Sequence, residues 1–387
     1  MHLLSRVKNK LKKLIRGDAG YKQTADWNTK FDTLLLHRPV SLHYWPAPSN
    51  PYQKLFYGAS TDRFHATAGS LEEAIDALQS EHRRHICFHL HWLSQLFEGG
   101  DTEVTRQTVA AFLENLRAFC SGGGTFVWTM HNFQEHDRTE SPFETEARQT
   151  IADLAQAVFV HGEAAKEAVA AHLPEAAAKL HIIPHGHYIG VYPDAIRPQT
   201  ARTKLNLPPE DTVFLNLGFV RKYKGLSALC ESAESLDRAV VTVAGFVNEN
   251  DREDLETLFA SFRQARLYAG WVPEEEIQVY MNAADFVVLP YVASLTSGAA
   301  LLALSFGVPV IAPAIGPFPE LIRNGKNGFT YNPSDPAALR AALARACKTS
   351  DAGRAAMRVT AYETASQMTW SAGRAALFQV LAENITP

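Results

Sequence analysis

The stretch from Asp285 to Gly328 reads DFVVLPYVASLTSGAALLALSFGVPVIAPAIGPFPELIRNGKNG and decides the fold expected for this chain. Phe286–Leu289 is a short apolar run of strand type, and Pro290 ends it. A polar turn and a helix of small residues follow, and Val308–Ile311 is the next expected strand before a loop rich in proline and glycine. Strand, helix and strand in this order are typical of a βαβ unit in a parallel sheet.

The start of that helix, at Thr296-Ser297-Gly298, is a candidate anion-binding site. The first N–H groups of a helix have no intrahelical partner, and the helix dipole adds partial positive charge there. In open α/β sheets, ligands bind at the carboxyl ends of strands, where this helix begins. A phosphate group is therefore the expected ligand. An ordinary βαβ unit without a ligand is the alternative that this stretch alone leaves open.

Length and composition favour a globular chain of two domains. The chain has 387 residues, of which 46% are hydrophobic, so two domains of roughly 150–200 residues each are expected. The four cysteines form no CxxC pair, which favours buried thiols in a reducing compartment over disulfides or metal ligands. No apolar run reaches the roughly 18 residues needed to cross a bilayer, and the N-terminus lacks the pattern of a secretory signal.

The net charge of −4 is unevenly distributed. Residues 1–16 carry six basic and no acidic side chains, which leaves 31 basic and 41 acidic residues, or −10, for the rest. An acidic body argues against nucleic acid as a partner. Within 1–16 the apolar residues recur at helical spacing between lysines, which predicts a basic amphipathic helix on an anionic membrane surface. We therefore expect a cytoplasmic protein, peripheral on the inner face of the cell membrane; a helix docked on its own domain is the alternative.

Strands and helices alternate through two successive halves, which predicts an α/β fold of parallel, doubly wound sheets. The halves are an N-terminal domain at 30–190 and a C-terminal domain at 200–365; a last helix at 366–387 either stays with the second domain or crosses back. The site is expected in the cleft between the halves. The strands expected in the first half are Thr33–Leu36, Ile86–Leu90, Thr125–Thr129, Ala157–Val160 and Leu180–Ile183. Ser70 and Glu73 are expected to form a capping box at the start of a helix over Leu71–Leu78.

A basic loop follows the first expected strand of the second half. The sequence Gly218-Phe-Val-Arg221-Lys222-Tyr-Lys224-Gly225 then opens a helix. An arginine can bridge two phosphate oxygens and a lysine adds a point charge, so the loop suits a diphosphate. A solvated basic loop is the alternative, particularly for Lys222.

Taken in order, these motifs resemble the GT-B-type glycosyltransferases related to glycosyltransferase family 4. The matching pieces are Gly218…Arg221…Lys224-Gly225, Gly270-Trp-Val-Pro273, Leu289-Pro290-Tyr291, Thr296-Ser-Gly298, Ser305-Phe-Gly307 and Pro319-Glu320. Looser matches in the first half are Phe88-His89-Leu-His91-Trp92, Trp128-Thr-Met-His131-Asn132 and Pro184-His185-Gly186-His187. The resemblance implies a GT-B fold, with two Rossmann-like domains facing across a cleft and a nucleotide sugar held mainly by the C-terminal one.

The resemblance also implies roles for individual residues. Arg221 and Lys224, next to Gly218, match the basic pair that grips the donor diphosphate. Ser297 and Gly298 match the helix start that supplies N–H groups to it. The remaining donor-binding positions are Trp271 and Val272, in the loop that packs on the base, and Glu320, near the following phosphate-side or sugar-side loop.

Ser294 and Leu302 mark a departure from the family pattern. Retaining members of family 4 carry a pair of glutamates at these positions, so retention or inversion stays open. The surrounding sequence resembles a subgroup of mannosyl- and glucuronosyltransferases that assemble lipid-linked glycans and exopolysaccharides.

His131 follows the strand Thr125–Thr129 and is the first candidate for catalysis. The resemblance places this residue near the transferred sugar. A histidine there is suited to accept the proton of the acceptor hydroxyl, because its ordinary pKa is close to neutrality. Asp137 and, less favoured, Glu135 are carboxylates that offer the same function.

Two histidine pairs at alternate positions need a separate explanation. His89 and His91 share one face of a strand, and His185 and His187 are expected to line the cleft. A four-histidine metal site is the less favoured interpretation, because no other spacing fits metal ligands. We expect no metal and no cofactor, with the diphosphate charge of a GDP- or UDP-sugar held by basic residues and helix dipoles.

Asn50 and Tyr52 are the expected acceptor-binding residues, because acceptors enter near this loop in the family that the chain resembles. Tyr44 and Trp45, just upstream, offer aromatic faces for sugars, with core packing as the alternative. Together these features predict a metal-independent hexosyltransferase that uses a GDP- or UDP-sugar and a lipid-linked or polysaccharide-precursor acceptor. The alternatives are a catalytically silent GT-B scaffold that binds glycan, and a sugar-nucleotide epimerase.

Overall fold

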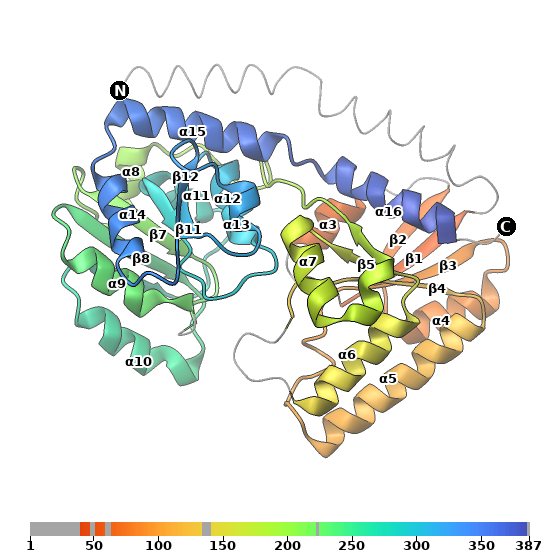
Figure 1. Ribbon diagram of the computed structural model, residues 1–387. Coiled ribbons are helices and arrows are strands. Elements are labelled where there is room, and N and C mark those ends of the chain that lie inside the picture. The colour runs from red at the N-terminus through yellow and green to blue at the C-terminus, as the bar shows by residue number, and fades with distance from the viewer. Residues whose placement is uncertain (1–38, 47–50, 59–62, 134–140, 222–223, 385–387) are drawn as a thin grey trace. The chain divides into compact units, whose positions relative to one another are not determined.

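The computed structural model describes residues 39–46, 51–58, 63–133, 141–221 and 224–384 (Figure 1). The described chain forms two compact units. Among the described residues, the N-terminal unit contains those within 39–186 together with 369–384, and the C-terminal unit contains His187–Met368. Each unit is built around one parallel sheet of six strands.

The sheet of the N-terminal unit has the strand order β2-β1-β3-β4-β5-β6. Its strands are β1 (Val40–Trp45), β2 (Phe64–Ala68), β3 (His85–Leu90), β4 (Thr125–Thr129), β5 (Ala157–Val160) and β6 (Leu180–Ile182). The helices of this unit are α3 (Pro51–Tyr57), α4 (Leu71–Ser80), α5 (Glu103–Ser121), α6 (Pro142–Leu154), α7 (Glu163–His172), the 3-10 helix η1 (Pro174–Lys179) and α16 (Trp370–Asn384).

Four of the five strands expected in this unit are confirmed, two of them with the same bounds. Strands β4 and β5 cover Thr125–Thr129 and Ala157–Val160 as predicted, and the predicted capping box of Ser70 and Glu73 begins α4. Strands β1 and β2 were not predicted. The predicted strand at 33–36 and the predicted helix at 1–16 lie outside the described residues.

The last helix, α16, belongs to the N-terminal unit, although it is the end of the chain (Figure 1). The guanidinium of Arg374 donates to the carbonyl oxygens of Leu55 and Phe56 in α3, at 3.0 and 3.1 Å. Gly373 lies so close to the main chain that a Cβ atom there would be 2.6 Å from the Pro184 carbonyl oxygen. These contacts complete the N-terminal unit with residues distant in sequence.

The sheet of the C-terminal unit has the strand order β12-β11-β10-β7-β8-β9. Its strands are β7 (Thr212–Leu217), β8 (Ala239–Gly245), β9 (Ala265–Ala269), β10 (Phe286–Val288), β11 (Val310–Pro313) and β12 (Gly328–Tyr331). Its helices are α8 (Pro198–Lys204), α9 (Leu226–Glu234), α10 (Glu249–Ala260), α11 (Ile277–Ala283), α12 (Gly298–Ser305), α13 (Phe318–Leu321), α14 (Ala338–Cys347) and α15 (Asp351–Ser366).

The stretch from Asp285 to Gly328 forms the predicted strand, helix and strand, with one shift. The second strand runs over Val310–Pro313 instead of 308–311, because the Val308 amide still donates to Ala303 at the end of α12. Gly328 begins the unpredicted strand β12 and pairs with Val310. Only glycine fits there, since a Cβ atom would lie 1.9 Å from the Val310 carbonyl oxygen.

Buried side chains cover both faces of each sheet, as expected of parallel strands between helices. The four cysteines are free thiols. A partly buried ion pair joins Arg202 of α8 to Asp285 at 2.7 Å, and it ties α8 to the start of β10. Within the described ranges, no helix combines the length and the apolar character needed to span a membrane.

Candidate functional site

The loops after β7 and β10 meet at the carboxyl end of the C-terminal sheet. Gly225 has a left-handed φ of 71°, and a Cβ atom there would lie 2.2 Å from the Pro290 carbonyl oxygen. The Lys224 ammonium lies 5.4 Å from the centre of the Tyr291 ring and donates to the Phe219 carbonyl oxygen at 2.7 Å. The basic loop after β7 therefore packs directly against the segment that leads from β10 into α12.

The start of α12 is built as the sequence predicted. Ser297 is the N-cap, and its hydroxyl accepts from the Ala300 amide at 3.2 Å. The amides of Gly298 and Ala299 precede the first hydrogen bond within the helix, and N–H groups at this position of a helix can bind an anion. The carbonyl oxygen of Ser294 packs against Gly316, where a Cβ atom would lie 2.1 Å away, so the loop after β11 joins the same edge.

Arg221 and Gly218 complete the basic loop. The Arg221 guanidinium lies 5.7 Å from the centre of the Phe219 ring. Gly218 has a φ of 132°, and its carbonyl oxygen would be only 1.7 Å from a Cβ atom at Gly245, so the glycine after β7 closely contacts the glycine that ends β8. Lys222 lies outside the described residues.

A row of exposed apolar side chains follows four neighbouring strands of this sheet. Val292, Phe219, Phe246 and Trp271 come after β10, β7, β8 and β9, and they are 74%, 54%, 40% and 64% exposed. Phe219 and Phe246 contact edge to face, with ring centres 6.0 Å apart. Trp271 and the half-buried Val272 follow β9, the strand at the edge of the sheet.

The positions that carry glutamates in retaining relatives offer no carboxylate here. Ser294 donates to the Thr296 carbonyl oxygen at 3.0 Å, and Leu302 is half-buried in α12. Glu320 is exposed in the short helix α13, after β11. It is the acidic side chain among the predicted donor-binding residues.

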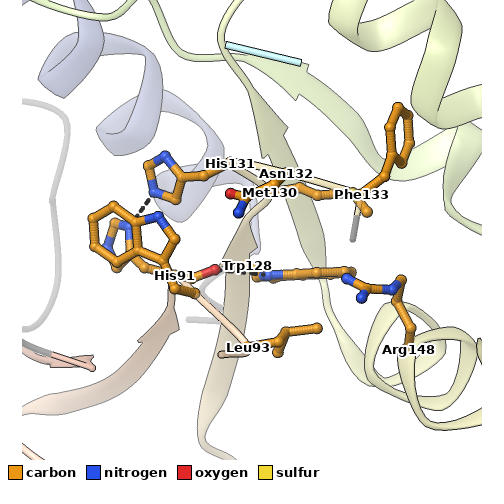
Figure 2. A pocket seen from close by; sticks show the side chains of 9 residues that line it. His91, Leu93, Trp128, Met130, His131, Asn132, Phe133 and Arg148 are labelled. Atoms are coloured by element: carbon orange, nitrogen blue, oxygen red, sulfur yellow. Dashed lines mark hydrogen bonds between the residues drawn. The ribbon is translucent and has the colours of Figure 1, made fainter. Parts of the chain in front are cut away.

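A small pocket in the N-terminal unit contains the predicted catalytic histidine. It opens after strands β3 and β4, and its wall includes His91, Trp92, His131, Asn132 and Arg148. Figure 2 shows His91 and His131 joined by a hydrogen bond at one side of this pocket, with Arg148 at the other. The described pocket therefore combines imidazoles, an amide, a cation and aromatic rings.

His131 itself is held on all sides. Its Nε2 lies 3.0 Å from Nδ1 of His91, and its Nδ1 lies 3.2 Å from Nε2 of His161. The Trp92 ring stacks on it, with ring centres 4.2 Å apart and planes 12° from parallel. Burial and the neighbouring His161 and His185 hold the pKa of His131 well below its ordinary value of 6.5. The side chain is therefore neutral, and it is a weaker base than the ordinary histidine that the sequence analysis expected here.

Tyr52, predicted to bind the acceptor, is only 1% exposed. Its ring contacts those of His131, His185 and Trp370 edge on, at centre distances of 4.9, 5.1 and 5.3 Å. Tyr44 stacks on Tyr57 at 4.3 Å. In this structure, Tyr52 thus belongs to the interior beneath the pocket. Asn50, Glu135 and Asp137 lie outside the described residues.

His185 and His187 fall in different units despite their alternate spacing. His185 is buried beside Trp370, and its Nδ1 donates to the Gly186 carbonyl oxygen at 2.7 Å. In the C-terminal unit, Nδ1 of His187 accepts from the Ile189 amide at 3.2 Å. Among the described residues, no cluster of three His, Cys, Asp or Glu side chains is arranged to hold a metal ion.

Three residues of the pocket surroundings were missed by the sequence analysis: Tyr57, Thr129 and His161. Tyr57 ends α3, Thr129 ends β4 and His161 directly follows β5. The sequence could have predicted His161, because a histidine follows each of the strands β3, β4, β5 and β6. No sequence pattern predicts Tyr57 and Thr129, since their contacts depend on the order of the strands.

Two units, each with a parallel sheet of six strands between helices, define a GT-B fold, which solved structures share. Sucrose-phosphate synthase from Thermosynechococcus elongatus superposes with a TM-score of 0.63 at 17% identity, over 90% of this chain and 99% of that chain. Anabaena HepE, solved in complex with UDP and glucose, gives a TM-score of 0.66 at 15% identity, over 89% and 100% of the two chains. At such identities the likeness shows the fold alone.

Residues 198–364 match the family described as glycosyl transferases group 1. This chain is a GT-B-type protein, and the match to that family lies within its C-terminal unit. Similar curated proteins include the D-inositol 3-phosphate glycosyltransferase of Corynebacterium kroppenstedtii, 26% identical over 64% of this chain and 58% of that protein. The GDP-mannose:glycolipid 4-beta-D-mannosyltransferase of Xanthomonas campestris pv. campestris is 26% identical over 69% and 70%. The sulfoquinovosyl transferase SQD2 of Arabidopsis thaliana matches over only 27% of its length, at 29% identity.

Proposed function

We propose that this protein transfers a hexosyl unit from a nucleoside-diphosphate sugar to a hydroxyl group of a lipid-linked or polysaccharide-precursor acceptor. One observation carries the proposal: Gly225 packs on Pro290, which joins the basic loop of Arg221 and Lys224 to the segment that starts α12. Two cations on a loop that packs against the segment leading into α12, together with the first amides of that helix, suit a diphosphate. The match of residues 198–364 to the glycosyl transferases group 1 family supports the same conclusion.

The same contacts suggest how the donor is activated. As the bond from the anomeric carbon to the diphosphate oxygen breaks, negative charge grows on the leaving group. Lys224, Arg221 and the Gly298 amide stabilise that charge, which lowers the barrier as preorganised donors do in oxyanion sites. The proton of the attacking hydroxyl passes to His131 or to Asp137. No step uses a metal ion.

The donor and acceptor are proposed by class. The Xanthomonas relative is named for GDP-mannose and a glycolipid, and HepE was solved with UDP. We therefore propose a GDP- or UDP-sugar as donor and a lipid-linked glycan as acceptor.

Residues 1–16 are proposed to hold the protein on an anionic membrane surface on the cytoplasmic side. Six basic residues without an acidic one support this proposal, since each Lys or Arg near such a surface contributes about 1 kcal/mol. Deleting residues 1–16 should reduce pelleting with anionic liposomes, and more so at low salt. Equal pelleting of the deletion variant and the full chain contradicts the membrane proposal.

Thermal unfolding with saturating UDP, GDP or ADP tests the donor site. A ligand at about 100 times its dissociation constant adds about 2.7 kcal/mol to the stability of the native state. A rise in Tm with GDP alone favours a mannosyl donor, and a rise with UDP alone favours a glucosyl or glucuronosyl donor. No rise with any nucleotide favours the glycan-binding scaffold. A sugar-nucleotide epimerase would convert its donor without any acceptor.

A further inference from the structure

A continuous chain of hydrogen bonds crosses the N-terminal unit beneath the pocket. It starts at the Thr129 hydroxyl, which lies 2.7 Å from Nε2 of His89. The Tyr57 hydroxyl then lies 2.8 Å from Nδ1 of His89 and 2.6 Å from Nε2 of His91. From His91 the chain continues through His131 at 3.0 Å and His161 at 3.2 Å. It ends at the Ile183 carbonyl oxygen, 2.9 Å from Nδ1 of His161.

The Ile183 carbonyl oxygen sets the direction of every bond in this chain. A carbonyl oxygen only accepts, so Nδ1 of His161 must carry a proton, and in a neutral imidazole Nε2 then accepts. Nδ1 of His131 must therefore donate to His161, and its Nε2 must accept from Nδ1–H of His91. By the same argument Tyr57 donates to His91 and accepts from His89, and Thr129 donates to His89. All four histidines are Nδ1–H tautomers.

The surroundings of these hydrogen bonds favour the neutral state of each imidazole ring. Tyr52 and His185 also face these rings, and neither carries a negative charge at neutral pH. Burial lowers the pKa of His161 to about 4, although its hydrogen bond to Ile183 raises it in part. For His91, burial and the neighbouring histidines hold the pKa well below its usual range.

Within this series of hydrogen bonds, the bond between His91 and His131 lies at the wall of the pocket, since both residues line it (Figure 2). With the direction fixed, His91 presents a donor there and His131 an acceptor. A hydroxyl group needs one of each, because its oxygen accepts and its O–H donates. A hydroxyl group that inserts between the two rings can accept from Nδ1–H of His91 and donate to Nε2 of His131, in place of their direct hydrogen bond.

We propose that His161, anchored on the Ile183 carbonyl, is a positioning residue that fixes the tautomer of His131 and so makes His91 and His131 a donor–acceptor pair for the acceptor hydroxyl. The inference rests on the proposed function. In the transfer step, the hydroxyl O–H bond breaks and Nε2–H of His131 forms, while the oxygen bonds to the anomeric carbon. The bond from that carbon to the diphosphate breaks, and the electron pair leaves with the nucleoside diphosphate. The resulting imidazolium keeps donating from Nδ1 to His161.

Two substitutions at one position separate positioning from packing. In His161→Gln, the side-chain oxygen can accept from His131 while the NH₂ group donates to Ile183, so the direction of the chain is kept. His161→Leu fills similar space and removes the anchor. We expect His161→Leu to lower kcat by about 100-fold, the usual contribution of an acid–base group, with the KM for the donor unchanged. His161→Gln should remain close to the wild type in both constants.

Nitrogen-15 NMR of the histidine rings in the full chain provides a readout that does not depend on activity. The wild type and His161→Gln should show His131 protonated at Nδ1 alone from pH 6 to 8, whereas His161→Leu should lose that single state. Tyr57→Phe removes the hydroxyl group that donates to Nε2 of His91, on the side of His91 away from His131. This substitution should leave the His131 tautomer unchanged. An Nε2–H tautomer of wild-type His131, or equal kcat values for His161→Leu and the wild type, would overturn the inference. Absence of nucleotide binding would instead overturn the proposed function, while the tautomer result would still stand.

Discussion

The ammonium of Lys224 lies 5.4 Å from the centre of the Tyr291 ring, although 66 positions separate the two residues in the sequence. This contact exists because β7 and β10 are neighbours in the C-terminal sheet, so the loops at their carboxyl ends share one edge. It joins the two segments that the sequence analysis had assigned separately to a diphosphate.

Replacing Lys224 by Ala should weaken nucleotide diphosphate binding by about 10- to 100-fold. A hydrogen bond to a charged group contributes about 1.5–3 kcal/mol, and each 1.4 kcal/mol changes Kd tenfold. Titration calorimetry with the nucleotide that raises Tm gives the change in Kd. Lys204→Ala, at an exposed lysine of α8, is the matched control and should bind like the wild type. Equal Kd values for Lys224→Ala and the wild type would place the diphosphate elsewhere.

Replacing Trp271 by Ala should weaken nucleotide binding without lowering the stability of the protein. The ring is 64% exposed, so its removal leaves no cavity. Stacking of a base on an aromatic side chain contributes about 1–3 kcal/mol, so Kd should rise by roughly 5- to 100-fold. Val104→Ala, at a residue 73% exposed on the N-terminal unit, is the control for removal of surface apolar area. A Kd that does not change removes Trp271 from the base-binding loop.

Gly225→Ala should destabilise the C-terminal unit more than Gly190→Ala does. Both glycines are left-handed, with φ of 71° and 78°, but a Cβ atom at Gly190 meets nothing within 4 Å. Backbone strain alone costs about 1–2 kcal/mol, and this is the loss expected for Gly190→Ala. At Gly225 the overlap of the new Cβ atom with the Pro290 carbonyl oxygen adds to this loss of stability. It also pushes the basic loop away from the segment that leads into α12. Urea unfolding of both variants measures the difference, and nucleotide affinity should fall only for Gly225→Ala.

Stability should fall as the pH drops from about 6.5 to about 4, because the N-terminal unit buries neutral histidines. Burial lowers the pKa of His89 and His185 to about 3 and that of His161 to about 4. Below the ordinary value of 6.5 the unfolded chain therefore binds protons that the folded chain does not. Each such group removes about 1.4 kcal/mol per pH unit in this window.

Urea unfolding at pH 7.5, 6.0 and 5.0 measures this dependence. His161→Gln should show a shallower decline than the wild type, because one of the titrating groups is gone. A free energy of unfolding that stays constant between pH 7.5 and 5.0 would mean that these rings are charged or exposed in the folded state.

Local sequence patterns predicted the fold class and most elements, because they depend on residues close together in the chain. The apolar runs of β4 and β5, the capping box of Ser70 and Glu73, and the break at Pro290 are examples. Strands β1 and β2 were missed since VSLHYW and FHATA mix polar with apolar residues, and only their pairing in the sheet makes them strands.

By itself, the sequence determined the parallel α/β architecture, the basic loop with Arg221 and Lys224, and the helix that begins after Ser297. Each follows from spacing, capping or charge within a few residues. The tertiary structure decided that Gly225 meets Pro290, that Tyr52 is buried, and that His131 is bonded on both nitrogens. These contacts join residues tens of positions apart, and they arise only when the order of the strands brings their carboxyl ends to one edge.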